Sequence, residues 1–200
     1  MTMDEKSPLT VGVLVNPFAG IGGAVGLKGS DGAETRAEAL RRGARPMAVE
    51  RMTRALQALG PAARPLRWLT WGGDMGEHSC RDAGLQAEIV GQSPPASEAE
   101  HSREAAAALV TAGVDLLLFA GGDGTARDLV DAVGQRIPVL GVPAGCKMHS
   151  AVYAVNPEAA GHLLADMRDG GLVALREAEV RDIDEEAFRH GEVRARYYGS

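Results

Sequence analysis

Short apolar runs alternate with longer amphipathic segments along most of the chain. Runs rich in β-branched or large aliphatic residues, closed by glycine, proline or asparagine, predict five buried strands: residues 11–15, 66–71, 87–90, 115–120 and 138–142. Segments whose apolar positions are spread round helical turns predict helices over residues 34–42, 46–59, 76–83, 98–112, 126–133 and 157–169. Because strands and helices alternate, we expect an α/β fold: a Rossmann-like parallel sheet with helices on both faces.

The pattern changes near the end of the chain. From residue 173 it favours strand, and residues 192–198 alternate as a half-exposed strand would. We therefore divide the chain into an N-terminal α/β domain, residues 1–172, and the start of a β-rich second domain, residues 173–200. So short a segment cannot form a stable sheet domain alone. It is expected to be incomplete, with the chain a fragment or the unit completed by another segment.

Glycine-rich loops follow three of the predicted strands at their carboxyl ends, where open α/β sheets bind ligands. The strongest signal is GGDGT at residues 121–125. Without side chains at three of these positions, backbone N–H groups can approach phosphate oxygens closely. The helix that follows would add the partial positive charge of its N-terminus. This loop therefore predicts a phosphate-binding site.

Asp123 is the residue of that loop whose charge opposes phosphate binding. A carboxylate among phosphate-binding amides costs electrostatic energy unless it holds Mg²⁺ or accepts a proton, and phosphoryl transfer uses both roles. The alternative is a plain turn in which Asp123 caps the helix. The five histidines show no metal-ligand spacing, and His149 is of interest because it lies beside the loop at residues 143–147.

Composition narrows the class of protein. With 45% hydrophobic and 24% charged residues, the chain has the usage of a soluble globular protein. A net charge of −6 argues against sequence-independent nucleic-acid binding, which needs clustered Lys and Arg. The N-terminus lacks the apolar core of a signal peptide and no window is apolar enough to span a membrane, so a cytoplasmic protein without membrane attachment is expected. The two cysteines agree with a reducing compartment.

Three segments in order carry a resemblance to a known family: NPFAGIGGAVGLKGSDG (16–32), DLLLFAGGDGTARDL (115–129) and GVPAGCKMHSAVYAVNPEAAG (141–161). The second resembles the signature of the superfamily of NAD kinases, diacylglycerol-type lipid kinases and phosphofructokinases. Together the three resemble the ATP-NAD kinase family, in the branch that contains the acetoin-catabolism X-type proteins. The resemblance implies transfer of the terminal phosphate of ATP, with Mg²⁺, to the 2′-hydroxyl of NAD to give NADP. It also implies a homo-oligomer, since dimers or tetramers are usual in the family.

The resemblance also implies roles for particular residues. Asp123 would be catalytic, orienting or deprotonating the acceptor hydroxyl, and no tightly bound metal is expected. NAD kinases carry an Asn-Glu or Asn-Asp pair that holds the acceptor; here Glu177 stands at the acidic position and Arg176 at that of the asparagine. The nucleotide phosphates would be bound by Asn16, Gly20, Gly22, Gly23, Lys28, Gly121, Gly122, Gly124, Thr125, Gly145 and Lys147.

Two alternatives stay open. A kinase of the same fold could act on another small hydroxyl compound or on a lipid, although the acidic chain shows neither the basic nor the apolar surface usual for lipid kinases. The second alternative is a non-catalytic nucleotide-binding module with a regulatory role, and the presence of Asp123 argues against it.

Overall fold

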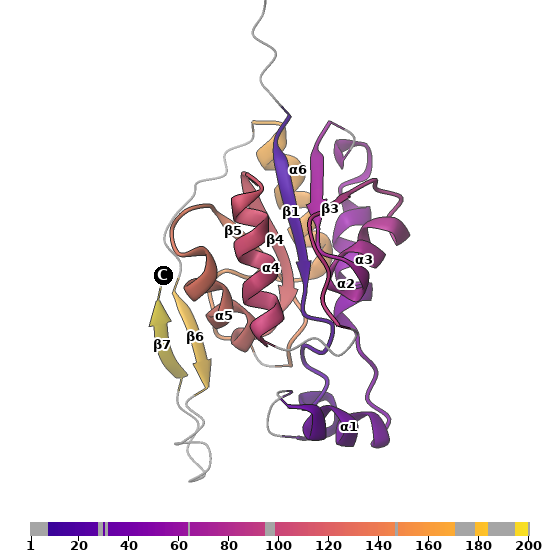
Figure 1. The fold of residues 1–200 in the computed structure, drawn as a ribbon, viewed down its shortest axis with the longest axis vertical. Helices are drawn as coiled ribbons and strands as arrows, with labels where there is room; N and C mark the ends of the chain where they lie inside the picture. Colours follow the sequence, from indigo (N-terminus) through magenta and orange to yellow (C-terminus); the bar gives the residue numbers. More distant parts are fainter. Residues whose placement is uncertain are drawn as a thin grey trace, which may run out of the picture.

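The computed structural model describes residues 8–27, 30, 32–63, 65–94, 99–146, 148–170, 179–183 and 195–199. Its centre is a parallel sheet with the strand order β3-β2-β1-β4-β5, and Figure 1 shows β1 and β4 at its middle. The predicted Rossmann-like parallel sheet is thus confirmed. The strands are β1 (Thr10–Val15), β2 (Arg67–Thr70), β3 (Glu88–Ile89), β4 (Leu116–Gly121) and β5 (Val139–Pro143).

The two central strands are buried along their whole length. Every residue of β1 and of β4 is buried, which explains why both read as continuous apolar runs rather than as alternating ones. The two strands pair with each other from Val11–Leu116 to Val15–Ala120. The outer strand β3 has only two residues, both exposed.

Helices cover both faces of the sheet, as predicted. On one face, α2 (Ala48–Ala58), α3 (Glu77–Asp82) and α6 (Pro157–Arg168) form a core with alternate residues of β1, β4 and β5. On the other face, α4 (Ala99–Thr111) and α5 (Asp123–Val133) pack on the remaining residues of the same strands. The predicted start of α6 is confirmed, with Pro157 in its first turn and the Asn156 side chain accepting from the backbone N–H of Ala159.

The helix α1 (Ala33–Arg41) differs from this pattern, because it does not cover the sheet. Figure 1 shows it beyond the carboxyl ends of β1 and β4. It has a small core of its own, formed by Ile21, Ala39 and Ala44, and the guanidinium of Arg36 lies 4.9 Å from the centre of the Phe18 ring. Ala39 is the buried apolar residue of α1, whereas Leu40 is 49% exposed, so the helix buries little apolar surface and packs on the loop that follows β1.

Near the end of the chain, β6 (Val180–Ile183) and β7 (Ala195–Gly199) pair antiparallel in a separate two-stranded sheet. Val180 is buried against residues of α5. The domain boundary after residue 172 stays a prediction, since residues 171–178 lie outside the described part. Within the described ranges, no helix combines the length and the apolar character needed to cross a membrane.

Candidate functional site at the carboxyl edge of the sheet

The strand order reverses between β1 and β4, and their connections leave toward opposite faces. After β1 the chain continues to α2 on one face, whereas β4 runs directly into α5 on the other. Open α/β sheets bind ligands where the connections diverge in this way, at the carboxyl ends of the strands. We call this end of β1, β4 and β5 the carboxyl edge. Loops containing most of the predicted site residues lie there.

Asn16 joins the loop after β1 to the GGDGT segment. Its backbone N–H donates to the carbonyl oxygen of Ala120 at 2.9 Å. Its side-chain Nδ2 donates to Oγ1 of Thr125 at 3.0 Å. Two predicted residues that are far apart in sequence are therefore in direct contact at the point where the sheet order reverses.

The loops after β1 and β5 also pack directly on each other. Gly20 has a φ of +74°, and a Cβ atom added there would lie 2.4 Å from the carbonyl oxygen of Ala144. A Cβ atom on Gly23 would lie 2.8 Å from Sγ of Cys146. Close loop packing is thus sufficient to require glycine at both positions. The N–H of Gly22 is used within its own loop, where it donates to the Ser30 hydroxyl at 3.1 Å.

The helix α5 starts at Asp123 rather than at residue 126, so Asp123, Gly124 and Thr125 form its first turn. Gly122 is the N-cap residue, in extended conformation and without a side-chain cap bond. The alternative in which Asp123 caps the helix is therefore wrong. Among the described residues, no acceptor is found for the backbone N–H groups of Asp123, Gly124 and Thr125, as expected at a helix N-terminus.

The Asp123 carboxylate is buried, with 5% of the residue exposed, yet it is fully supported by hydrogen-bond donors. Its Oδ2 accepts from the backbone N–H of His149 at 2.6 Å and contacts the imidazole Nδ1 of His149 at 3.1 Å. Its Oδ1 accepts from the backbone N–H of Ser150 at 3.0 Å. Charge-assisted bonds of this kind stabilise a buried carboxylate.

These donors make Asp123 a poor direct ligand for a metal ion, because both oxygens are already engaged. The described ranges contain no group of three or more His, Cys, Asp or Glu side chains placed to hold one. The three donors therefore hold the Asp123 carboxylate in one orientation at the start of α5.

Ser150 extends this network to β6. Its hydroxyl Oγ donates to the carbonyl oxygen of Arg181 at 2.9 Å and accepts from the N–H of Arg181 at 3.1 Å. The N–H of Ala151 donates to the carbonyl oxygen of Glu179 at 2.9 Å. One residue thus supports the Asp123 carboxylate with its backbone and β6 with its side chain.

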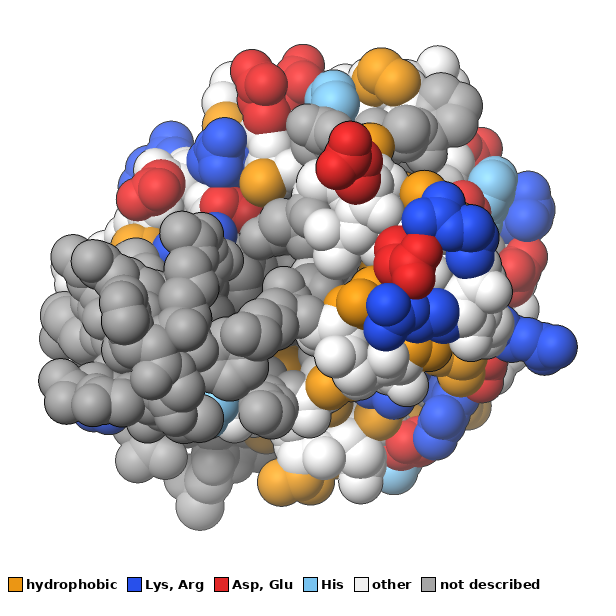
Figure 2. Space-filling model, turned by 90° about the horizontal axis from the view of Figure 1, so that it is seen from below, with side chains coloured by type: hydrophobic (Ala, Val, Ile, Leu, Met, Phe, Trp, Pro, Cys, Tyr) orange, Lys and Arg blue, Asp and Glu red, His pale blue; other side chains and the backbone are white. Residues whose placement is uncertain are grey.

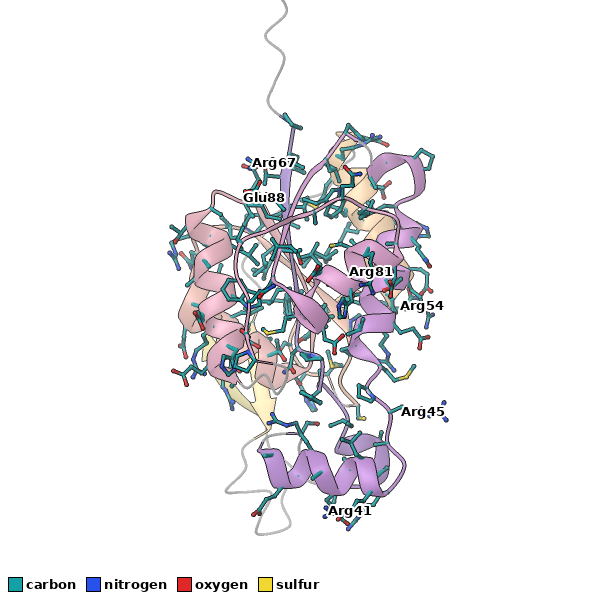
Figure 3. The ribbon with its side chains drawn as sticks, turned by 45° about the vertical axis from the view of Figure 1, so that its right-hand side comes forward. Arg41, Arg45, Arg54, Arg67, Arg81 and Glu88 are labelled. Carbon is teal, nitrogen blue, oxygen red and sulfur yellow. The ribbon has the colours of Figure 1, made fainter. Side chains whose placement is uncertain are left out.

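Sequence reasoning missed Ser150, Tyr153 and Arg51. The Tyr153 hydroxyl donates to the carbonyl oxygen of Gly122 at 2.6 Å, which fixes the residue before α5. The segment at 141–161 contains Ser150 and Tyr153, but their partners are distant in sequence. Arg51 lies in the first turn of α2, and its Nη1 donates to the carbonyl oxygen of Pro143 at 3.0 Å, at the end of β5. By contrast, Arg54 on the same helix lies on its outer side (Figure 3).

Three predicted residues, Lys28, Lys147 and Glu177, lie outside the described residues, and their roles stay predictions. Seen from the carboxyl edge, basic and acidic side chains are interspersed on the described part of the surface (Figure 2). Phosphate binding at this edge would therefore depend on helix N-termini and single cations rather than on a broad basic surface.

Both cysteines are free, and their environments differ. Cys146 is exposed and its thiol donates to the carbonyl oxygen of Gly20 at 3.3 Å. Cys80 lies in the core between α3 and the sheet, where burial raises the pKa of its thiol from 9.0 to about 12. Cys80 is therefore a packing residue.

Comparison with known proteins identifies the family. The model of the ATP-NAD kinase N-terminal domain matches residues 11–172. A search of curated proteins found no match. Similar solved structures include a candidate diacylglycerol kinase from Bacillus anthracis str. Sterne, 16% identical over 81% of this chain and 40% of that chain, with a TM-score of 0.38. A second, described among the diacylglycerol kinases of the same strain, is 16% identical over 83% of this chain and 41% of that one, with a TM-score of 0.32.

The chain thus spans about 40% of the length of these two proteins. The family match covers the parallel sheet from Val11 onward and the loops that follow β1, β4 and β5 at the carboxyl edge. On this evidence the chain belongs to the ATP-NAD kinase family, and its residues 11–172 correspond to the N-terminal domain of that family.

Proposed function

We propose that this chain is the nucleotide-binding part of a kinase that transfers the γ-phosphate of ATP to the 2′-hydroxyl of NAD, giving NADP and ADP. The observation that carries the proposal is the first turn of α5. There, backbone N–H groups suited to phosphate lie beside a buried carboxylate that is held in one orientation by three donors.

The phosphates of ATP would bind at the N-terminus of α5. The N–H groups of Gly124 and Thr125 belong to a helix of 11 residues, whose partial positive charge favours an anion at this end. The loops after β1 and β5, packed on each other through Gly20, would form the neighbouring wall. Arg51 lies at the end of β5 and would add a positive charge there.

Mg²⁺ would enter with ATP, bound chiefly by phosphate oxygens. Mg²⁺ commonly keeps several waters and uses substrate phosphates together with few carboxylates. This fits an edge whose described carboxylate, Asp123, is already occupied by backbone donors. When bound, the ion would neutralise charge on the transferred phosphoryl group.

The acceptor hydroxyl would approach the Asp123–His149 pair. Residues attached to β6 would lie close to the same place, because Ser150 contacts both Asp123 and Arg181. The predicted acceptor residue Glu177 precedes β6 in the sequence. This placement supports an acceptor site formed where the second unit begins.

The test is formation of NADP from NAD, ATP and Mg²⁺ by the purified chain and by a longer protein that contains it, measured by a coupled NADP-specific dehydrogenase assay. Asp123→Asn should lose turnover while retaining ATP binding, measured by calorimetry at a temperature where the variant is folded. Asp82→Asn, at the exposed end of α3, is the matched control and should behave as the unchanged chain. ATP binding without NADP formation, by this chain and also by a longer protein that contains it, would mean that the acceptor is another hydroxyl compound. Absence of ATP binding would refute the kinase proposal.

A further inference from the structure

The side chains of Asp123 and His149, which contact each other, differ in their exposure to solvent. The Asp123 side chain is only 4% exposed, whereas the His149 side chain is 35% exposed. The imidazole Nδ1 faces the carboxylate Oδ2 at 3.1 Å. A substrate at the carboxyl edge can therefore reach the imidazole more readily than the carboxylate behind it.

The carboxylate also has little accepting capacity left. Two backbone N–H groups and the imidazole share its two oxygens, at 2.6, 3.0 and 3.1 Å. Any substrate hydroxyl would have to compete with these donors in a buried position.

The same contact determines which imidazole nitrogen carries the hydrogen. An ionised carboxylate is an acceptor only, so Nδ1 of His149 must donate to it. In a neutral imidazole the lone pair is then on Nε2, and no partner of this nitrogen is found in the part of the chain that the structure describes. A buried carboxylate behind an accessible imidazole is the arrangement that enzymes use to fix a general base in its active tautomer.

We propose that His149 is the proton acceptor of the reaction and that Asp123 is a positioning residue that fixes the tautomer of His149; this inference rests on the proposed phosphoryl transfer. The oxygen of the acceptor hydroxyl forms a bond to the γ-phosphorus as the bond from that phosphorus to the β,γ-bridging oxygen breaks. The proton of the hydroxyl moves to Nε2 of His149, ADP leaves with the bridging oxygen, and the imidazolium then returns the proton to water.

The kinetic test uses two substitutions of His149. His149→Asn keeps an amide donor near the position of Nδ1 but has no basic nitrogen, so kcat for NAD phosphorylation should fall about 100-fold while KM for ATP changes little. His149→Ala should lose a similar factor and regain at least about tenfold when imidazole is added to the solution, because the site is open to solvent. His149→Asn with kcat within about twofold of the unchanged chain would overturn the proposal.

The matched control is His78→Asn. His78 also pairs with a carboxylate through Nδ1, at 2.7 Å from Oδ1 of Asp74, but both side chains are exposed and lie on the surface at α3. This substitution should leave kcat unchanged, and imidazole should have no effect on it.

A second readout does not depend on turnover. In ¹⁵N NMR at pH 8, where an ordinary imidazole is neutral, His149 should carry its hydrogen on Nδ1, with the signal assigned by its absence from His149→Asn. In Asp123→Asn this preference should be lost. If the unchanged chain forms no NADP, the proposed acceptor fails, and this measurement then decides on the pair alone. A hydrogen found on Nε2 of His149 in the unchanged chain would refute the inference.

Discussion

Replacing Asp123 by asparagine should destabilise the protein as well as impair its reaction. The substitution exchanges one carboxylate oxygen for an NH₂ group inside a buried network. Three donors surround the side chain: the N–H groups of His149 and Ser150 and the imidazole Nδ1. If the amide oxygen keeps the two contacts of Oδ2, the NH₂ group faces the N–H of Ser150, and two donors then oppose each other.

The magnitude follows from the hydrogen bonds that are changed. A buried donor left without an acceptor costs about 1–3 kcal/mol. The two bonds that remain lose their charge assistance, at about 1 kcal/mol each. The free energy of unfolding should therefore fall by about 3–5 kcal/mol, against a total of roughly 5–15 kcal/mol for a typical domain. The variant should still fold at low temperature.

Urea denaturation followed by circular dichroism measures this difference. Asp82→Asn is again the control, because the Asp82 side chain is exposed and pairs with that of the neighbouring Arg81 on the surface. The unfolding free energy of this variant should stay within about 0.5 kcal/mol of the unchanged chain. Equal stability of Asp123→Asn and the unchanged chain would show that the carboxylate does not hold the loop at His149 and Ser150, and the reasoning above would be refuted.

Three further predictions concern other parts of the chain. Burial raises the pKa of the Cys80 thiol from 9.0 to about 12, so the thiol of the unfolded chain loses its proton at a lower pH than that of the folded chain. The free energy of unfolding should therefore fall by about 1.4 kcal/mol between pH 8 and pH 10. Urea titrations of Cys80→Ala should lack this loss, and a variant with the same pH dependence as the unchanged chain would contradict the assignment. Ser150→Ala removes both hydrogen bonds to the backbone of Arg181. Hydrogen exchange of the Arg181 amide, measured by NMR, should therefore become about tenfold faster or more. An unchanged exchange rate would mean that other contacts hold β6. Arg51→Ala should weaken ATP binding, measured by calorimetry, about tenfold. Arg54→Ala should not, because the partner of Arg54 lies on α6. Equal effects of the two substitutions would rule out a role for Arg51 in phosphate binding at the end of β5.

Much of the fold could be predicted from the chain because the signals are local. Strands buried on both faces of a parallel sheet have continuous apolar sequences, and the sequences of β1 and β4 are of this kind. The sequence predicts a start of α5 that is too late, at residue 126, because glycine and aspartate have low helix propensity. In the structure these residues form its first turn, where the helix makes few internal bonds and propensity matters less than the donors at its end.

The candidate site could be located from the sequence, but its internal contacts could not. Glycine-rich loops that follow parallel strands indicate a ligand site at the carboxyl edge, even when the contacts between the loops are unknown. The bond from Asn16 to Thr125 and those from His149 and Ser150 to Asp123 join positions that are 109, 26 and 27 residues apart. No local pattern encodes such pairs, because they depend on the register of β1, β4 and β5 in the finished sheet.

The close packing of the loops at this edge limits how the site can vary by mutation. At Gly23 any side chain would collide with Cys146, so a substitution there needs a second change in another loop. Gly26 has open space around its Cβ position but a φ of +75°, so it should accept asparagine or aspartate at modest cost. In a saturation library, tolerated variants should therefore accumulate at Gly26, while changes at Gly23 should be recovered only together with changes at Cys146.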